Sequence, residues 1–458
     1  MQYRHFHPLY TLKYINYGLV LCLLPLVRAV LDFNWQQFLV ALQQDAFILI
    51  VMALLAGVLW YFSGFEITDS SVVLHQGLFF RSNVTLSRDM IAAVECVRPL
   101  TYRILGGTQV IIYFKSAFPL KKITLHFFTK DAIQAADTLL PVKNMPTVFE
   151  PTGATRLVFV MLSANVVTSC VFAVYSIKRI SKILGTQVEE YALHGITELS
   201  HFLELFIPAG ISMLATFVLL ITVLTLMLSL LRTAGFVVGR GGGIILTKGG
   251  FITKIERRVS AVCVNFCDVR LTPFARVLRY TPVYITAGGY RSDTPLFVCR
   301  MGQEAMLQRL LADFTMPTHK MCVVRKKSLP VYIWLPASLC ALLIALICVA
   351  ANINMIGMIP VLSLLLLFAL CNLGIEIEAF IKEGFCKNDN RTFSICYGRI
   401  FTRHTVCIFS HDISFTIQQS PIAAKDGRCN LYINTPARVR LRARDAIPHR
   451  VKTVSFNL

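Results

Sequence analysis

Four arginines near the C-terminal end of the chain alternate with apolar residues, in the run Arg438-Val439-Arg440-Leu441-Arg442-Ala443-Arg444. On a β-strand, a period of two places all four guanidinium groups on one face and the apolar side chains on the other. Such a face can bind phosphate-bearing lipid headgroups, at roughly 1 kcal/mol per basic residue near an anionic surface. The alternative is a solvated strand face whose charge prevents edge-to-edge aggregation. The sequence leaves both interpretations open.

A second basic cluster, Arg325, Lys326 and Lys327, stands directly before a long apolar stretch. Basic residues at this position normally determine the orientation of a membrane helix. Specific binding of an anionic lipid is the alternative.

Three further basic residues, Arg103, Arg276 and Lys425, recur at one place in a repeated pattern. Arg103 follows Gly77 by 26 residues and Arg276 follows Gly250 by 26 residues, whereas Lys425 follows Gly398 by 27 residues. We expect them to serve packing or a turn, or to contact headgroups or a neighbouring domain. If the domains pack together, Arg103 and Arg276 should be buried.

The remaining polar residues form no recognisable reactive set. No carboxylate pair, Ser/His/Asp set or His cluster is positioned at a membrane face, and none of the fourteen cysteines has Cys-x-x-Cys spacing. We therefore predict no catalytic residue, no metal site and no cofactor, and a protein that is not an enzyme.

The elements that position these residues follow from the hydropathy of the chain. A mean hydropathy of +0.62 with 15% charged residues is too apolar for one soluble fold of 458 residues. Six stretches approach the roughly 20 apolar residues that a spanning helix needs. They are Tyr14 to Leu31, Ala46 to Phe62, Leu157 to Ile177, Phe206 to Leu231, Leu329 to Ala350 and Met355 to Leu373. Short connectors in the first and last pairs predict antiparallel helical hairpins.

Positive charge predicts the orientation. The three segments that follow the helix pairs hold 38 of the 45 Lys and Arg residues, and such residues are retained in the cytoplasm. We expect both termini and all three segments on the cytoplasmic side, with residues 178–205 as the only sizeable external segment.

The cytoplasmic segments have β patterns. In the first, residues 71–76 and 78–86 form a hairpin around Gly77, and residues 109–114 form a later strand. A closing helix is expected over residues 132–140, with Thr129-Lys130-Asp131 at its start and Ile133, Ala136, Leu139 and Leu140 on its apolar face. A similar helix is expected over residues 303–314. A β barrel or sandwich closed by one helix is the plan of a pleckstrin-homology (PH) domain.

Several short motifs carry a family resemblance: Ile67-Thr68, Gly77, Ile91 to Glu95, Arg103-Ile104-Leu105-Gly106 and Ile285-Thr286-Ala287-Gly288-Gly289. They resemble bacterial PH-like domains, and the whole chain resembles the multi-pass YdbS/YdbT-type membrane proteins, formerly a domain of unknown function. The third segment departs from the pattern, because Lys425-Asp426-Gly427-Arg428 replaces the arginine motif and no amphipathic helix follows.

The resulting fold class is a membrane α+β protein with six transmembrane helices in three antiparallel hairpins, each followed by a cytoplasmic PH-like β domain. The predicted parts are hairpin 1 (1–64), PH-like domain 1 (65–150), hairpin 2 (155–232), PH-like domain 2 (233–320), hairpin 3 (328–375) and a divergent PH-like domain 3 (376–458).

Fold alone does not supply a function. We expect a non-enzymatic scaffold in the bacterial cytoplasmic (inner) membrane whose PH-like domains bind anionic phospholipid headgroups, each other or a partner protein. The resemblance implies a smaller single-domain PH-like membrane protein as partner, or self-association, and a role in envelope stress or defence. No helix-turn-helix or RNA-binding signature supports a nucleic acid partner. A membrane transporter or channel component built from repeated hairpins is the alternative.

Overall fold

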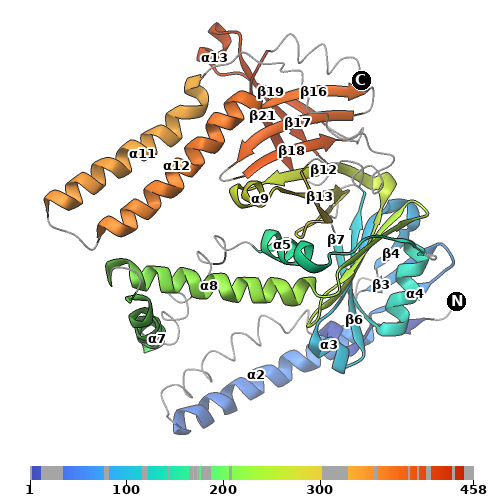
Figure 1. Cartoon of the computed structure of the whole chain (residues 1–458). Helices are drawn as coiled ribbons and strands as arrows, with labels where there is room; N and C mark the ends of the chain where they lie inside the picture. The colour runs from blue at the N-terminus through green and yellow to red at the C-terminus, as the bar shows by residue number, and fades with distance from the viewer. Residues whose placement is uncertain are drawn as a thin grey trace.

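The computed structural model describes residues 3–11, 35–76, 82–115, 122–142, 145–164, 187–205, 209–301, 329–353, 358–389, 392–399, 402–408, 414–435 and 439–447, and isolated residues between 165 and 176. It has the mixed α+β class expected from the sequence. Long apolar helices extend from one side of a row of β-sheets that runs from the N-terminal to the C-terminal part of the chain (Figure 1).

Among the described residues, three helices contain stretches long and apolar enough to cross a membrane: Ala215–Thr233, Ile333–Asn352 and Val361–Ile381. The long helices are α2 (Trp35–Tyr61), α5 (Gly153–Ser163), α7 (Gln187–Leu203), α8 (Ala209–Thr233), α11 (Leu329–Asn352) and α12 (Ile359–Lys382). α11 and α12 lie side by side as the expected hairpin, with Cys340, Leu343 and Ala369 buried between them (Figure 1). α7 forms a helix within the expected external segment and packs against α8.

The other predicted spans are seen in part. Residues 14–31 lie outside the described residues. Apolar stretches of α2 (Asp45–Tyr61) and α5 are shorter than a full span. α12 continues to Lys382, nine residues beyond the predicted end at Leu373, because Glu376 and Glu378 in its last turns have cationic partners in the β domains.

The strands form four sheets. The first contains β1 (Arg4–His5), β2 (Gly64–Ile67), β3 (Ser71–Gln76) and β4 (Ser82–Ser87), in that order. The second has the order β7-β6-β5-β11-β10-β9-β8, with β5 (Ile91–Arg98), β6 (Gly107–Phe114), β7 (Lys122–Phe128), β8 (Thr147–Phe149), β9 (Val237–Gly241), β10 (Ile244–Gly249) and β11 (Lys254–Ser260).

The third sheet has the order β14-β13-β12-β18-β17-β16, with β15 also paired to β13. Its strands are β12 (Val264–Leu271), β13 (Tyr280–Ala287), β14 (Tyr290–Arg291), β15 (Phe297–Arg300), β16 (Gly384–Asp389), β17 (Thr392–Arg399) and β18 (Thr402–Ile408). The fourth contains β19 (Ser414–Gln418), β20 (Cys429–Asn434) and β21 (Arg440–Ala446).

The sheets do not coincide with the three β segments of the chain. β5 pairs with β11, so the first and second segments share one sheet, and β12 pairs with β18, so the second and third segments share another. We call the segments unit 1, unit 2 and unit 3, and the two shared strand pairs the joints. Each unit therefore contributes its first half to one sheet and its second half to the next.

Strand registers recur between the units. In unit 1, Glu95 lies opposite Ile111, and in unit 2, Asp268 lies opposite Tyr284. Both residues of the second pair are 173 positions later in the chain than those of the first (268 − 95 and 284 − 111). In unit 3, Thr416 lies opposite Tyr432 at a further offset of 148 (416 − 268 and 432 − 284). The joints also share one register, because β11 places Arg257 opposite Glu95 and β18 places Val406 opposite Asp268.

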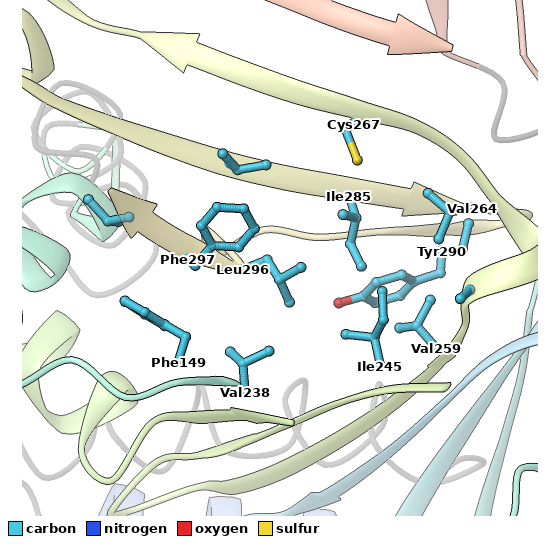
Figure 2. Close-up of a cluster of buried hydrophobic side chains, with 14 of the residues drawn as sticks. Phe149, Val238, Ile245, Val259, Val264, Cys267, Ile285, Tyr290, Leu296 and Phe297 are labelled. Carbon is cyan, nitrogen blue, oxygen red and sulfur yellow. The ribbon is translucent and has the colours of Figure 1, made fainter. Parts of the chain in front are cut away.

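Each unit has its own apolar core between its two half-sheets. Figure 2 shows the core of unit 2, where Val238 and Ile245 from one layer face Ile285 and Phe297 from the other. Alternating apolar side chains on strands produce such a sandwich, because every second residue points to the same face. The core of unit 1 also contains Ile244 of unit 2, so the units are packed together.

The ends of unit 1 differ from the predicted boundaries. β8 lies within the predicted domain 1 but pairs with β9 of unit 2. The N-terminal residues were assigned to the first hairpin, yet β1 pairs with β2, and Phe6 and Tyr10 are buried in the core of unit 1. Trp60 of α2 donates a hydrogen bond to the Phe6 carbonyl over 2.7 Å, which helps to hold this segment in place.

The closing helix of unit 1 is α4 (Thr129–Leu139). It begins at Thr129, whose hydroxyl donates to the Gly106 carbonyl rather than capping the helix. Ala132, Ala135, Ala136 and Leu139 are buried, whereas Ile133 is exposed, so the predicted apolar face was wrong at Ile133. Residues 303–314 lie outside the described residues. The last described element of unit 3 is the strand β21, at the alternating arginines.

Candidate functional site

The alternating arginines have the predicted strand geometry where they are described. Leu441 and Ala443 of β21 are buried in the core of unit 3, and Arg440 and Arg442 are exposed on the other face. Both guanidinium groups lie over the ring of Tyr432, at 3.8 Å and 5.8 Å from its centroid. Arg438 lies outside the described residues. Two of the four arginines therefore form an exposed cationic face.

Arg444 does not belong to that face. Its guanidinium group lies 2.6 Å from Glu376 and 3.0 Å from Glu383, and its side chain is only 14% exposed. Burial disfavours the charge, but the two carboxylates outweigh it and raise the pKa of Arg444. Strand alternation predicted the direction of this side chain correctly but gave no sign of α12 opposite it. Arg444 joins unit 3 to α12 through these two carboxylates, and lipid binding by this residue stays a prediction.

The second predicted cluster, Arg325, Lys326 and Lys327, lies outside the described residues. Its position directly before α11 is known from the sequence alone.

Arg103 and Arg276 each contact the next part of the chain. Arg103, at the fourth position of α3 (Leu100–Ile104), donates to the Phe251 carbonyl of unit 2 over 3.2 Å. Arg276, at the fourth position of α9 (Pro273–Val277), forms an ion pair with Glu378 of α12. Arg276 is partly buried and Arg103 is exposed, so neither side chain is fully buried as expected for packed domains. Lys425 is the fifth residue of α13 (Pro421–Lys425) and is exposed, one position beyond the other two.

A different basic region lies where α8 meets the sheets. The turn after β10 is hydrogen-bonded to the end of α8: Gly250 donates to the Ala234 carbonyl and Phe251 to the Leu231 carbonyl, both over 2.8 Å. Gly250 has a φ of +99°, and a Cβ there would lie 2.0 Å from the Thr253 carbonyl oxygen, so this turn requires glycine.

Beside this turn is a hollow of about 320 Å³ between units 1 and 2. Its lining includes three basic residues, Arg98, Lys248 and Lys254, against one carboxylate, that of Glu256. Lys248 and Lys254 are exposed, and Lys248 lies 3.3 Å from Glu256. Arg258 also binds Glu256, at 2.9 Å. We call Arg98, Lys248 and Lys254 with this hollow the α8 basic site.

Exposed apolar side chains lie beside the α8 basic site. Phe251 is 67% exposed at the turn itself, and Ile104, on the helix whose Arg103 reaches that turn, is 77% exposed. Lys and Arg next to apolar side chains at the end of a membrane helix are typical of the membrane interface, where each basic residue attracts anionic lipid. This arrangement can place phosphate oxygens against ammonium and guanidinium groups while apolar side chains enter the lipid.

Another hollow, of about 500 Å³, lies between α4 and the turn that joins β2 to β3. Its charged lining is balanced: Arg88 and Lys130 stand against Asp69 and Asp137. A balanced lining does not favour an anion, so the α8 basic site is the better candidate for binding a phosphate group.

The sequence contained only a weak signal for the α8 basic site. Lys248 and Lys254 flank the Gly250 turn, but Arg98 is about 150 residues earlier in the chain and joins them only through the β5·β11 joint. Within the described ranges, no group of three or more His, Cys, Asp or Glu residues is arranged to hold a metal ion.

Comparison with known proteins gives one match. Searches of curated proteins and of solved structures returned no match. A family model described as "Bacterial PH domain" matches residues 18–141. That range covers the strands of unit 1 from β2 to β7 together with α4, which is the part of the molecule with the expected closing helix. The chain therefore contains a bacterial PH-like domain in its N-terminal part.

Proposed function

We propose that the protein is a non-enzymatic scaffold of the bacterial inner membrane, whose β units form a cytoplasmic platform that binds anionic phospholipid headgroups. The three apolar helices anchor the platform, and the β units lie together at one end of them (Figure 1). The excess of 45 basic over 25 acidic residues favours an anionic partner. The sequence places most of this charge on the side of the β units, which is the side expected to be cytoplasmic.

The observation that carries the proposal is the α8 basic site. The Gly250 turn is hydrogen-bonded to the end of a candidate membrane span. This supports a position of Lys248 and Lys254 near the headgroups. Two exposed lysines at this depth contribute roughly 2 kcal/mol toward an anionic surface. A smaller single-domain PH-like membrane protein, or a further copy of the chain, remains the proposed protein partner.

A transporter is less well supported. The carboxylates described in α12, Glu376 and Glu378, lie near its end and pair with Arg444 and Arg276 of the β units. Ionisable residues that act in transport normally face a pathway near the middle of the membrane. The described carboxylates of α12 instead attach the helix to the platform.

The test compares two variants of the full chain that each remove two positive charges. Lys248→Ser/Lys254→Ser alters the α8 basic site, and Arg440→Ser/Arg442→Ser alters the exposed face of β21. Each protein is purified with a mixture of phosphatidylglycerol and phosphatidylcholine, and the retained lipids are identified by native mass spectrometry. We expect the lysine variant to bind phosphatidylglycerol at least tenfold more weakly and the arginine variant to behave as the wild type.

Each other result has a clear meaning. If only the arginine variant loses phosphatidylglycerol, the headgroup site is on β21. If neither variant differs from the wild type, binding of anionic headgroups by these residues is rejected, and the scaffold must act through protein partners.

A further inference from the structure

In the described sheets, the strand at each end of the row of units has no neighbour at the position that the two joints fill. At the joints, β11 and β18 of incoming units pair with β5 and β12. β4 occupies in unit 1 the place that β11 occupies in unit 2. Leu74 lies opposite Val84 in unit 1, and the residues 173 positions later, Thr247 and Arg257, lie opposite each other in unit 2. The counterpart of β12 in unit 3 is β19, because Thr416 corresponds to Asp268.

β4 and β19 are terminal strands in the described sheets. The first sheet ends at β4 and the fourth begins at β19. They belong to the first and last units, at opposite ends of the row (Figure 1). Val84 and Thr85 of β4 are exposed, and Thr416 of β19 is partly exposed.

Neither strand carries the charges that usually protect an edge. β4 reads Ser-Asn-Val-Thr-Leu-Ser and β19 reads Ser-Phe-Thr-Ile-Gln, without one charged residue in a chain of net charge +20. Exposed edges are normally protected by Lys, Pro or a bulge, because unpaired backbone groups template association. Two uncharged edges at matching positions are what a further strand pair requires.

We propose that β4 of one copy of this chain pairs antiparallel with β19 of a second copy, in the register of the internal joints. Val84 would then lie opposite Thr416, as Arg257 lies opposite Glu95, and Leu86 opposite Ser414, as Val259 lies opposite Ala93. The contact is head-to-tail, so it leaves a free β4 and a free β19 on every pair and continues into a ring or an open row. The inference rests on the proposed scaffold function and names a second copy as the partner, but it does not require lipid binding.

The first experiment uses cysteine cross-linking of the full chain in native membranes. Val84→Cys and Thr416→Cys are made singly and together, and cross-linked with a short bismaleimide, since directly opposed Cβ atoms lie about 5 Å apart. We expect the double variant to give a ladder of cross-linked oligomers. Co-expression of the two single variants should give dimers and nothing larger, because each chain then carries one of the two cysteines. The wild type shows the background from the native cysteines, of which Cys348 and Cys371 are exposed. Dimers from one single variant above this background would show a symmetric contact, and absence of product from the double variant would likewise overturn the proposal.

A charge-exchange experiment controls for chance contacts. Val84→Arg/Thr416→Arg places two positive charges opposite each other and should reduce the oligomer to single chains in mass photometry. Val84→Arg/Thr416→Glu recreates the Arg257–Glu95 arrangement and should restore the oligomer. Equal masses for these two variants would reject the pairing.

The same samples separate this inference from the proposed function. Retention of phosphatidylglycerol by Val84→Arg/Thr416→Arg should equal that of the wild type, because neither residue belongs to the α8 basic site. If the wild type is a single chain and still retains phosphatidylglycerol, the strand pairing is rejected and the proposed lipid binding is not.

Discussion

At the residue scale, the most consequential charged groups are those that join parts of the molecule. Glu383 is 1% exposed on its side chain and accepts hydrogen bonds from both the backbone and the guanidinium group of Arg444. A buried carboxylate is tolerated only while it has such partners. Arg444 therefore acts as the electrostatic partner of α12 and differs in this respect from Arg440 and Arg442.

We expect Arg444→Ala to destabilise the protein by roughly 3 to 5 kcal/mol, because it leaves Glu383 and Glu376 without their cation. The exposed neighbour provides the control: Arg442→Ala should change stability by less than about 1 kcal/mol. Equilibrium unfolding by SDS in mixed micelles measures both. Equal stabilities would mean that the ion pairs of Arg444 do not hold α12.

A second residue-scale expectation concerns acid. Burial favours the neutral form of Asp268, but His404 and Arg270 outweigh it and lower the pKa of Asp268 below its ordinary 3.8. Burial acts likewise on Glu256, whose pKa is lowered below 4.5 by Arg258 and Lys248. A carboxylate whose pKa is lowered in the folded protein stabilises the fold at any pH above its ordinary pKa. This stabilisation is lost as the pH falls through the pKa of the folded state.

The midpoint temperature of thermal unfolding should therefore not change with pH near neutrality as a result of these groups. It should decrease once the pH is below about 4.5. Asp268→Asn should be less stable than the wild type near pH 7, and the difference should narrow below pH 3.8. Asp426→Asn, in the pair of Asp426 with Arg428 on a more exposed surface, is the matched control and should have little effect at either pH. A constant difference for Asp268→Asn across the range would contradict the expectation.

At the element scale, the turn between β13 and β14 fits closely against unit 1. Gly288 has a φ of +51°, and a Cβ there would lie 2.3 Å from the Phe114 carbonyl oxygen and 2.7 Å from the Ala92 side chain. Gly289 donates to the same Phe114 carbonyl over 2.8 Å. This turn holds the second half of unit 2 against unit 1.

Gly242 offers a control for Gly288. Its φ is +56°, but a Cβ there would meet nothing within 4 Å. Gly242→Ala should cost only the backbone strain, about 1 kcal/mol, whereas Gly288→Ala should cost clearly more, because backbone atoms of unit 1 must move. Denaturation of the two variants under identical conditions compares them, and equal losses would show that the turn does not press against unit 1.

Local elements were predictable from the sequence, and their partners were not. The strand over Ser71–Gln76 was predicted with its bounds, because β-branched residues and the following Gly77 are local signals. The joints pair residues more than 130 positions apart, for which a single sequence holds no comparable signal. The same reason explains why the carboxylate partners of Arg444 and the α8 basic site could not be predicted from the sequence.

At the scale of the whole molecule, no unit is complete by itself. Unit 1 takes Ile244 into its core and receives Arg257 and Arg258 from β11, which pair with Glu95 and Asp137. Unit 3 gives β18 to a sheet of unit 2, where His404 lies 3.0 Å from Asp268. A cut between units exposes a strand edge together with unpaired buried charge.

We expect a fragment of residues 1–150 to be unstable or to aggregate when produced alone, and to co-purify with residues 151–458 when the two are co-expressed. Glu95→Arg in the smaller fragment should abolish co-purification, because it faces Arg257, and Arg257→Glu in the larger fragment should restore it. Lys122→Glu, at an exposed position of β7 on the far side of the sheet from β11, is the control and should not prevent co-purification. A 1–150 fragment that is stable and monomeric in detergent would contradict the shared sheet.

The joints also impose an order on biosynthesis. β5 leaves the ribosome well before its neighbour, since Glu95 and Arg257 are 162 residues apart. At roughly 5 to 20 residues per second, the first domain waits on the order of 10 to 30 s with that flank uncovered. In the proposed membrane arrangement α8 inserts into the bilayer during the same interval, so its insertion would precede completion of the domain synthesised first. Slow insertion of α8 would therefore leave the nascent first domain open to capture by chaperones or proteases.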